Sequence, residues 1–264
     1  DKAIVKLNVI KPYIGYPEEL PERYKDKVVD ETASLFENAL AFARVEIKHS
    51  WSKWNQPVDY KEWGMPAHMV NAYYNPQKNL IVFPAAILQA PFYDLHQSSS
   101  ANYGGIGAVI AHEISHAFDT NGASFDENGS LKDWWTESDY AAFKEKTQKV
   151  IDQFDGQESY GARINGKLTV SENVADLGGI AAALEAAKIE PDFSAEEFFH
   201  NFARIWRMKG RPELMKLMAS VDVHAPAKLR VNVQVPNFDD FFTTYDVKEG
   251  DGMWRSPEDR VIIW

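Results

Sequence analysis

Hydrophobic residues recur at helical spacing along most of the chain. In residues 28–49, apolar side chains such as Phe36 and Leu40 share one face of a 3.6-residue period, which predicts an amphipathic helix. Capping signals and apolar periodicity predict further helices, including a buried one at residues 103–118. The expected helices span residues 28–49, 103–118, 136–154, 171–188, 194–208 and 212–220.

Strand-like sequence is confined to one region. Residues 69–74 and 80–83 are rich in β-forming residues and flank the turn cluster at 75–79, which predicts a hairpin. Residues 1–25, rich in proline and charge, indicate a connector or wrapping arm. We therefore expect a mostly helical α+β domain over residues 26–264 with one small β-sheet.

The composition of the chain excludes several classes of partner and of metal ligand. The net charge of −11 argues against a nucleic-acid partner, because phosphate binding needs a basic face. The chain has no cysteine, so disulfides and thiolate metal ligands are excluded. No apolar run approaches the roughly 20 residues that span a bilayer, so we expect no membrane segment in this chain. The first residue is not methionine, and we expect the sequence to come from a longer protein.

The segment from His112 to His116 reads His-Glu-Ile-Ser-His. Residues four apart lie on one face of a helix, so both imidazoles can reach a single zinc ion at about 2.0–2.1 Å. Glu113 can reach a metal-bound water without being a ligand. A chance pairing of two histidines is the alternative, but the flanking apolar residues predict a buried helix. Unpaired polar side chains are costly there, which favours a metal.

A catalytic zinc needs a third protein ligand. Glu172 and Asp176, four apart on the helix expected at 171–188, can divide two tasks: one binds zinc and the other accepts the distal N–H of a ligand histidine. We take Glu172 as the ligand. Asp119 can orient His116 in the same way. Alone, Glu172 and Asp176 would be better explained as a solvated helix start favoured by the helix dipole.

Two stretches, residues 102–119 and 172–179, resemble the zinc-binding helices of the neprilysin and endothelin-converting-enzyme family. The family likeness extends in order from about residue 25 to the C-terminus. It implies a thermolysin-like (gluzincin) catalytic domain with one Zn²⁺ per chain. Further resembling segments are residues 71–73, 80–85, 222–226 and 230–232.

The resemblance also implies substrate-binding roles. Asn71 and the backbone of Ala72 would hold the substrate main chain as an added strand. His224 would stabilise the developing oxyanion, and Arg230 would bind a substrate carbonyl; without the family, both are better explained as structural. A specificity pocket would be lined by Ile87, Phe92, Val109, Ile205 and Trp206.

Two departures from the family pattern matter. A large, mostly helical domain precedes the catalytic part in family members, and here it is largely absent, so we expect a missing N-terminal domain as an intramolecular partner. Vertebrate members carry many cysteines and this chain has none, which favours a bacterial oligopeptidase. We expect it in the bacterial cytoplasm, with secretion or surface attachment through a missing segment as the alternative.

The expected reaction is hydrolysis of internal bonds of oligopeptides, with a hydrophobic residue preferred just after the cut and Glu113 as general base. Two alternatives stay open. One is a zinc aminopeptidase, and the other is a zinc-containing peptide-binding fragment that is inactive without its missing domain. A purely structural zinc site is disfavoured because three ligands leave a coordination position open.

Overall fold

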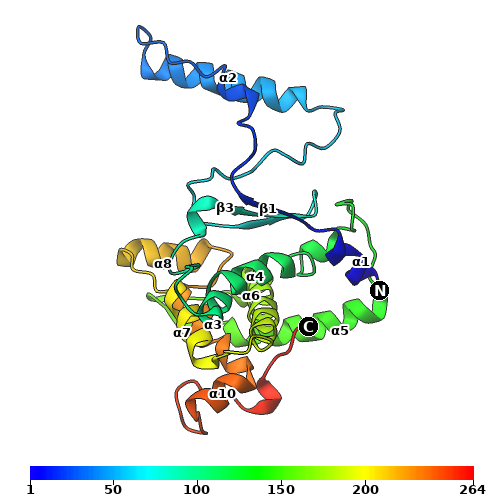
Figure 1. Cartoon of the computed structure of the whole chain (residues 1–264), viewed down its shortest axis with the longest axis vertical. Helices are drawn as coiled ribbons and strands as arrows, with labels where there is room; N and C mark the ends of the chain where they lie inside the picture. Colours follow the sequence, from blue (N-terminus) through cyan, green and yellow to red (C-terminus); the bar gives the residue numbers. More distant parts are fainter.

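The computed structural model describes all residues, 1–264, and helices form most of it (Figure 1). The helices are α1 (Lys2–Asn8), α2 (Leu35–Ser52), α3 (Ser99–Asn102), α4 (Ala108–Ser115), α5 (Glu137–Phe154), α6 (Gly166–Ala187), α7 (Ala195–Ile205), α8 (Pro212–Val221), α9 (Ala227–Asn232) and α10 (Asp239–Tyr245). The strands are β1 (Lys11–Gly15), β2 (Tyr73–Asn75), β3 (Leu80–Pro84), β4 (Glu158–Ser159) and β5 (Ala162–Arg163). The predicted helical α+β fold is confirmed.

Capping explains where the predicted helices begin. Thr136 forms a capping box with Asp139 at the start of α5, as its sequence indicates. The predicted start of α2 at residue 28 is wrong, because the capping box of Ser34 begins the helix at Leu35. The predicted start of α6 at residue 171 is also late. The side chain of Asn165 accepts from the backbone N–H groups of the first turn, so α6 begins at Gly166.

The main sheet has the strand order β1-β3-β2. The predicted hairpin is present as the antiparallel pair β2 and β3, whereas the parallel partner β1 was not foreseen. Every residue of β3 is buried, since it lies in the middle of the sheet. Strand β2 is an edge strand, and its outer side is not paired with another strand.

Helices α4 and α6 cross at very short range in the centre of the molecule (Figure 1). A Cβ atom at Gly179 would lie 2.8 Å from the backbone nitrogen of His112 and 2.9 Å from the carbonyl oxygen of Ala108. A Cβ at Gly178 would overlap the ring of Trp264, which is 2.1 Å away at Nε1. The two glycines therefore allow α6 to approach the histidine-bearing helix without an intervening side chain.

Helix α2 projects away from the rest of the molecule (Figure 1). None of its residues is buried, so the apolar face that its sequence pattern predicts is open, with Phe36 and Trp51 largely exposed. No helix in the structure combines the length and the apolarity needed to cross a membrane.

Candidate metal centre and active site

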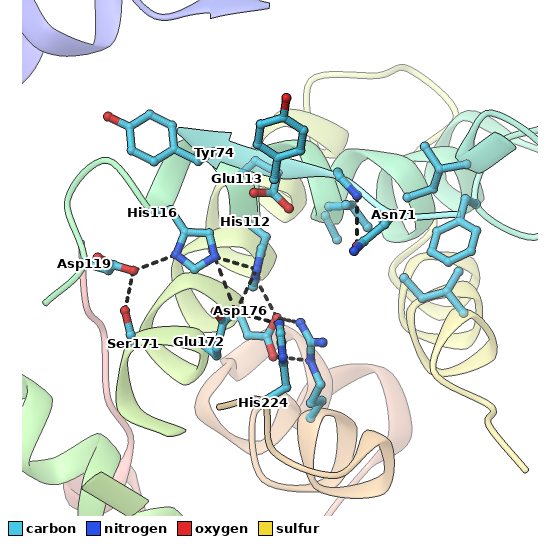
Figure 2. A pocket seen from close by; sticks show the side chains of 18 of the residues that line it. Asn71, Tyr74, His112, Glu113, His116, Asp119, Ser171, Glu172, Asp176 and His224 are labelled. Carbon is cyan, nitrogen blue, oxygen red and sulfur yellow. Dashed lines mark hydrogen bonds and ion pairs between the residues drawn. The ribbon is translucent and has the colours of Figure 1, made fainter. Parts of the chain in front are cut away.

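The two histidines of the His-Glu-Ile-Ser-His segment lie at the C-terminal end of a continuous helix. It runs through α3, a π-helical turn at Tyr103–Gly107, and α4. As their spacing predicts, His112 and His116 project from the same face, and their Nε2 atoms are 3.0 Å apart. Both nitrogens face α6 (Figure 2).

Glu172 of α6 completes a three-residue cluster. Its Oε2 atom lies 3.3 Å from Nε2 of His112 and 3.4 Å from Nε2 of His116. Ligand atoms that are each about 2.0–2.1 Å from a tetrahedral zinc are about 3.3 Å apart. The Oε2 atom is also buried without a hydrogen-bond partner in the chain. An unpaired buried acceptor facing two ring nitrogens fits a bound divalent cation.

Asp119 holds the outer nitrogen of His116. Its Oδ2 atom is 2.6 Å from Nδ1 of His116 and accepts a hydrogen bond from the hydroxyl of Ser171 at 2.6 Å (Figure 2). The other carboxylate oxygen accepts from the backbone N–H groups of Asn121 and Gly122, at 2.8 and 2.7 Å. Asp119 is therefore fixed by the loop that follows α4 and by α6, and it fixes the ring of His116 in turn.

Asp176 occupies the corresponding position behind His112. Its Oδ1 atom lies 2.8 Å from Nδ1 of His112, although the contact lacks the alignment of a full hydrogen bond. Arg230 donates to both carboxylate oxygens at 2.6 and 2.7 Å and stacks on Trp206 at 3.6 Å from the ring centroid. Burial acts to raise the pKa of Asp176, but Arg230 and His112 together outweigh this and lower the pKa to about 2. Asp176 is therefore a carboxylate at neutral pH.

Glu113 has a different environment. Its side chain is buried beside the two histidines and makes no hydrogen bond within the chain. Burial raises the pKa of Glu113, and the neighbouring histidines only partly oppose that change. For Glu172, burial also acts to raise the pKa, but contacts with three histidines lower it well below the ordinary value. The two glutamates therefore differ in proton affinity: the pKa is raised for Glu113 and lowered for Glu172.

His224 reaches the same place from the segment between α8 and α9. Its Nδ1 atom and backbone nitrogen contact Oδ1 of Asp222 at 2.8 and 2.9 Å, which fixes the ring. Its Nε2 atom lies 3.2 Å from Oε2 of Glu172. The contact with Glu172 raises the pKa of His224, and burial only partly opposes it.

One cavity of about 450 Å³ contains every site residue expected from the sequence. The lining combines the polar groups described above with the apolar side chains expected to form the specificity pocket. The backbone N–H of Ala72, beside edge strand β2, donates to the side-chain oxygen of Asn71 at 3.0 Å. The lining includes Asn71, Ala72, Ile87, Phe92, Val109, His112, Glu113, His116, Asp119, Glu172, Asp176, Ile205, Trp206, His224 and Arg230.

Comparison with known proteins decides the family. A profile described as peptidase family M13 matches residues 71–261, well over half of the chain. The chain belongs to peptidase family M13. The resemblance to the neprilysin and endothelin-converting-enzyme family is thereby confirmed. An endothelin-converting enzyme homologue of Locusta migratoria is 41% identical over 265 residues. The match covers 96% of this chain and 36% of that protein.

Bacterial relatives of this M13 chain are more similar. A Streptococcus gordonii protein, provisionally named a zinc metalloproteinase, is 86% identical over 198 residues, which are 75% of this chain and 35% of that protein. The crystal structure of PepO from Lactobacillus rhamnosis has a TM-score of 0.95 at 44% identity, covering 100% of this chain and 42% of that one. The M13 chain thus spans about two fifths of the length of these relatives.

The part that Ser171, Asp222 and Tyr74 play at this M13 site was missed at the level of the sequence. Ser171 joins Asp119 to α6 (Figure 2), Asp222 fixes His224, and Tyr74 lines the cavity. Ser171 directly precedes the third ligand candidate, and Asp222 lies two residues before His224. The sequence positions of Ser171 and Asp222, close to Glu172 and His224, could have indicated their roles. Nothing in the sequence around Tyr74 indicates that it faces the site.

Proposed function

We propose that this chain carries the catalytic centre of a zinc endopeptidase that hydrolyses internal bonds of oligopeptides. The observation that supports it best is the convergence of His112, His116 and Glu172 on the wall of a cavity that also reaches the open edge of β2. In this proposal the three side chains hold one Zn²⁺, with Asp119 and Asp176 orienting the two imidazoles. A zinc ion bound there supplies Lewis acidity and lowers the pKa of a water ligand towards about 7.

Glu113 is the proposed general base. Its buried carboxylate has a raised pKa and is free of hydrogen bonds within the chain, so it can accept a proton from the attacking water and pass it to the leaving amine. His224, whose raised pKa favours the imidazolium, donates to the oxygen of the reacting carbonyl. Losing one such donor typically costs about 10²–10³ in kcat.

The substrate is proposed to bind as an added strand beside β2. Asn71 would hold the peptide backbone, and the N–H of Ala72 becomes available once it leaves the side-chain oxygen of Asn71. Arg230 uses two nitrogens on Asp176, while its Nη1 makes no hydrogen bond within the chain and can reach a substrate carbonyl. The apolar side chains of the cavity lining, which include Phe92 and Ile205, favour a hydrophobic residue on the C-terminal side of the cut.

The parent protein is proposed to add a helical domain on the N-terminal side of this catalytic domain. Two observations support this: the chain spans about two fifths of its relatives, and helix α2 exposes an apolar face. A domain there would limit access to the cavity and so restrict substrates to short peptides. The cytoplasmic location expected from the sequence stays a prediction, which cell fractionation would test.

The test is digestion of peptides blocked at both ends, and of the same peptides with a free N-terminus, with and without a zinc chelator. The products are identified by mass spectrometry. We expect chelator-sensitive internal cuts before hydrophobic residues. Cuts only on peptides with a free N-terminus would replace the endopeptidase by an aminopeptidase. If this chain binds zinc but cuts no peptide, and the longer parent protein does cut, then catalysis requires both domains together.

A further inference from the structure

The N-terminal helix α1 carries a buried lysine, Lys6, whose side chain lies against the loop that follows His116. The side chain of Lys6 is only 1% exposed, and its ammonium lies 5.4 Å from the ring centroid of Trp134 and 5.7 Å from that of Phe118. Lysine is almost never buried to this degree unless its charge is satisfied. A specific set of acceptors must therefore surround it.

Three backbone carbonyl groups provide those acceptors. The Nζ atom of Lys6 donates to the oxygens of Ala117, Gly122 and Phe125 at 2.6, 2.8 and 2.6 Å. Only the ammonium form has three N–H donors, so the cage fits the charged side chain. Burial lowers the pKa of Lys6 to about 8, with Asp119 foremost among the acids that oppose this, and the ammonium therefore predominates at pH 7.

These carbonyl groups belong to the loop that holds Asp119. Ala117 directly follows His116, and Gly122 accepts from Lys6 through its oxygen while donating to Asp119 through its nitrogen. Asp119 in turn contacts Nδ1 of His116 at 2.6 Å. A continuous path of four residues thus leads from the buried ammonium to the imidazole of a candidate metal ligand.

A second path leads from α1 to the substrate side of the cavity. The side-chain amide of Asn79, in the β2–β3 turn, donates to the carbonyl oxygens of Lys6 and Glu127, both at 3.2 Å. The hydroxyl of Tyr74 donates to the side-chain oxygen of Asn79 at 2.8 Å. Lys6 therefore ties the loop after α4 to the hairpin whose edge borders the cavity.

We propose that Lys6 is a positioning residue that orders the loop at residues 117–125 and, through Asp119, fixes the imidazole of His116 for metal binding. The assignment rests on the proposed zinc site but not on peptidase turnover. It gives the N-terminal segment, which the M13 profile match does not include, a part in the active site. Without the ammonium, the three carbonyl groups lose their common donor and Asp119 loses its fixed loop.

The test compares Lys6→Met with Lys2→Met. Lys2 lies on the same helix, is exposed, and contacts one carbonyl, that of Trp134, at 3.4 Å. Zinc affinity is measured by chelator competition, and exchange of the Asn121 and Gly122 amides is measured without metal. Losing a residue bonded directly to a metal ligand typically costs about 10–100-fold in metal affinity. Lys6 acts through Gly122 and Asp119, so we expect Lys6→Met to weaken zinc binding severalfold and to speed hydrogen exchange at both amides. Lys2→Met should match wild type in both.

A rescue experiment separates positioning from general destabilisation. Because the chain has no cysteine, Lys6→Cys carries a unique thiol that can be alkylated in urea before refolding. An S-aminoethyl group restores a lysine-like ammonium, whereas an S-propyl group has the same length without charge. Restored amide protection and zinc affinity in the S-aminoethyl form alone would support the proposal. Equal behaviour of the two forms, or wild-type values in Lys6→Met, would overturn it.

The readouts also separate this proposal from the proposed function. If wild-type protein binds zinc but cleaves nothing, the endopeptidase assignment fails and the Lys6 comparison still holds. If wild-type protein binds no zinc, the zinc site fails. The exchange rates of the Asn121 and Gly122 amides then decide whether Lys6 orders the loop.

Discussion

The close crossing of α4 and α6 makes Gly179 a sensitive point, because this crossing sets the distance from Glu172 to the two histidines. In Gly179→Ala the new methyl group would lie 2.8 Å from the backbone nitrogen of His112, 2.9 Å from the Ala108 oxygen and 3.0 Å from the His112 Cα atom. Ordinary contacts begin at 3.4 Å. The helices must therefore separate by about 0.4–0.6 Å, because all three atoms belong to backbone that cannot rotate away.

The effect on stability should be small while the effect on metal binding should be large. Alanine is favoured over glycine within a helix by about 1 kcal/mol, and overpacking costs about 1–3 kcal/mol. The net loss is therefore about 0–2 kcal/mol. Metal–ligand distances, by contrast, tolerate only about 0.2 Å. We expect zinc affinity to fall by at least about tenfold.

The assay pairs thermal unfolding of the metal-free protein with chelator competition for zinc. Gly107→Ala is the matched control, since the nearest atoms to its methyl group would be Cδ1 of Tyr103 at 3.3 Å and the Asn102 oxygen at 3.5 Å. The control should keep wild-type zinc affinity. A folded Gly179→Ala protein that binds zinc as tightly as wild type would show that the spacing of the two helices does not set the ligand geometry.

Three other changes test separate parts of the account. Glu113→Gln should keep one zinc per chain by metal analysis yet lose peptide hydrolysis; retained turnover would remove Glu113 as the base. Ser171→Ala removes a 2.6 Å hydrogen bond to Asp119 and should weaken zinc binding severalfold in chelator competition, whereas an unchanged affinity would make that bond dispensable. Burial acts to raise the pKa of Glu62, but basic neighbours led by Lys53 lower it from 4.5 to about 2. Its stabilisation, about 1–2 kcal/mol after solvent screening, is complete above pH 4.5 and lost as the pH falls towards 2. At neutral pH the amides of α2 should therefore exchange faster in Glu62→Gln than in wild type, and this difference should vanish as the pH falls from 4.5 to about 2. A difference that stays constant with pH would refute the lowered pKa of Glu62.

Local sequence signals were enough to predict that His112 and His116 lie together. The spacing of His112 and His116 follows from helix geometry, so a helix there leaves little choice about where the imidazoles point. The pairing of those histidines with Glu172 was predicted from ligand chemistry and from the family likeness. Its structural cause, the glycine pair that allows α6 to approach, carries no local signal that identifies the partner helix.

The contribution of the N-terminal segment could not be read from the sequence. Lys6 looks like an ordinary surface lysine, and its three acceptors come from residues more than 110 positions away. Strand β1 follows shortly after α1 and pairs in parallel with β3. Nothing in its short sequence, which contains a proline and a glycine, indicates this long-range partner. Both features depend on tertiary packing rather than on local propensity.

The most direct test of the central claim is anomalous diffraction at the zinc absorption edge from crystals of the zinc-loaded protein. We expect one peak per chain, about 2.0–2.1 Å from Nε2 of His112, from Nε2 of His116 and from Oε2 of Glu172. A peak coordinated by other residues, or no peak in a protein that metal analysis shows to contain zinc, would contradict it.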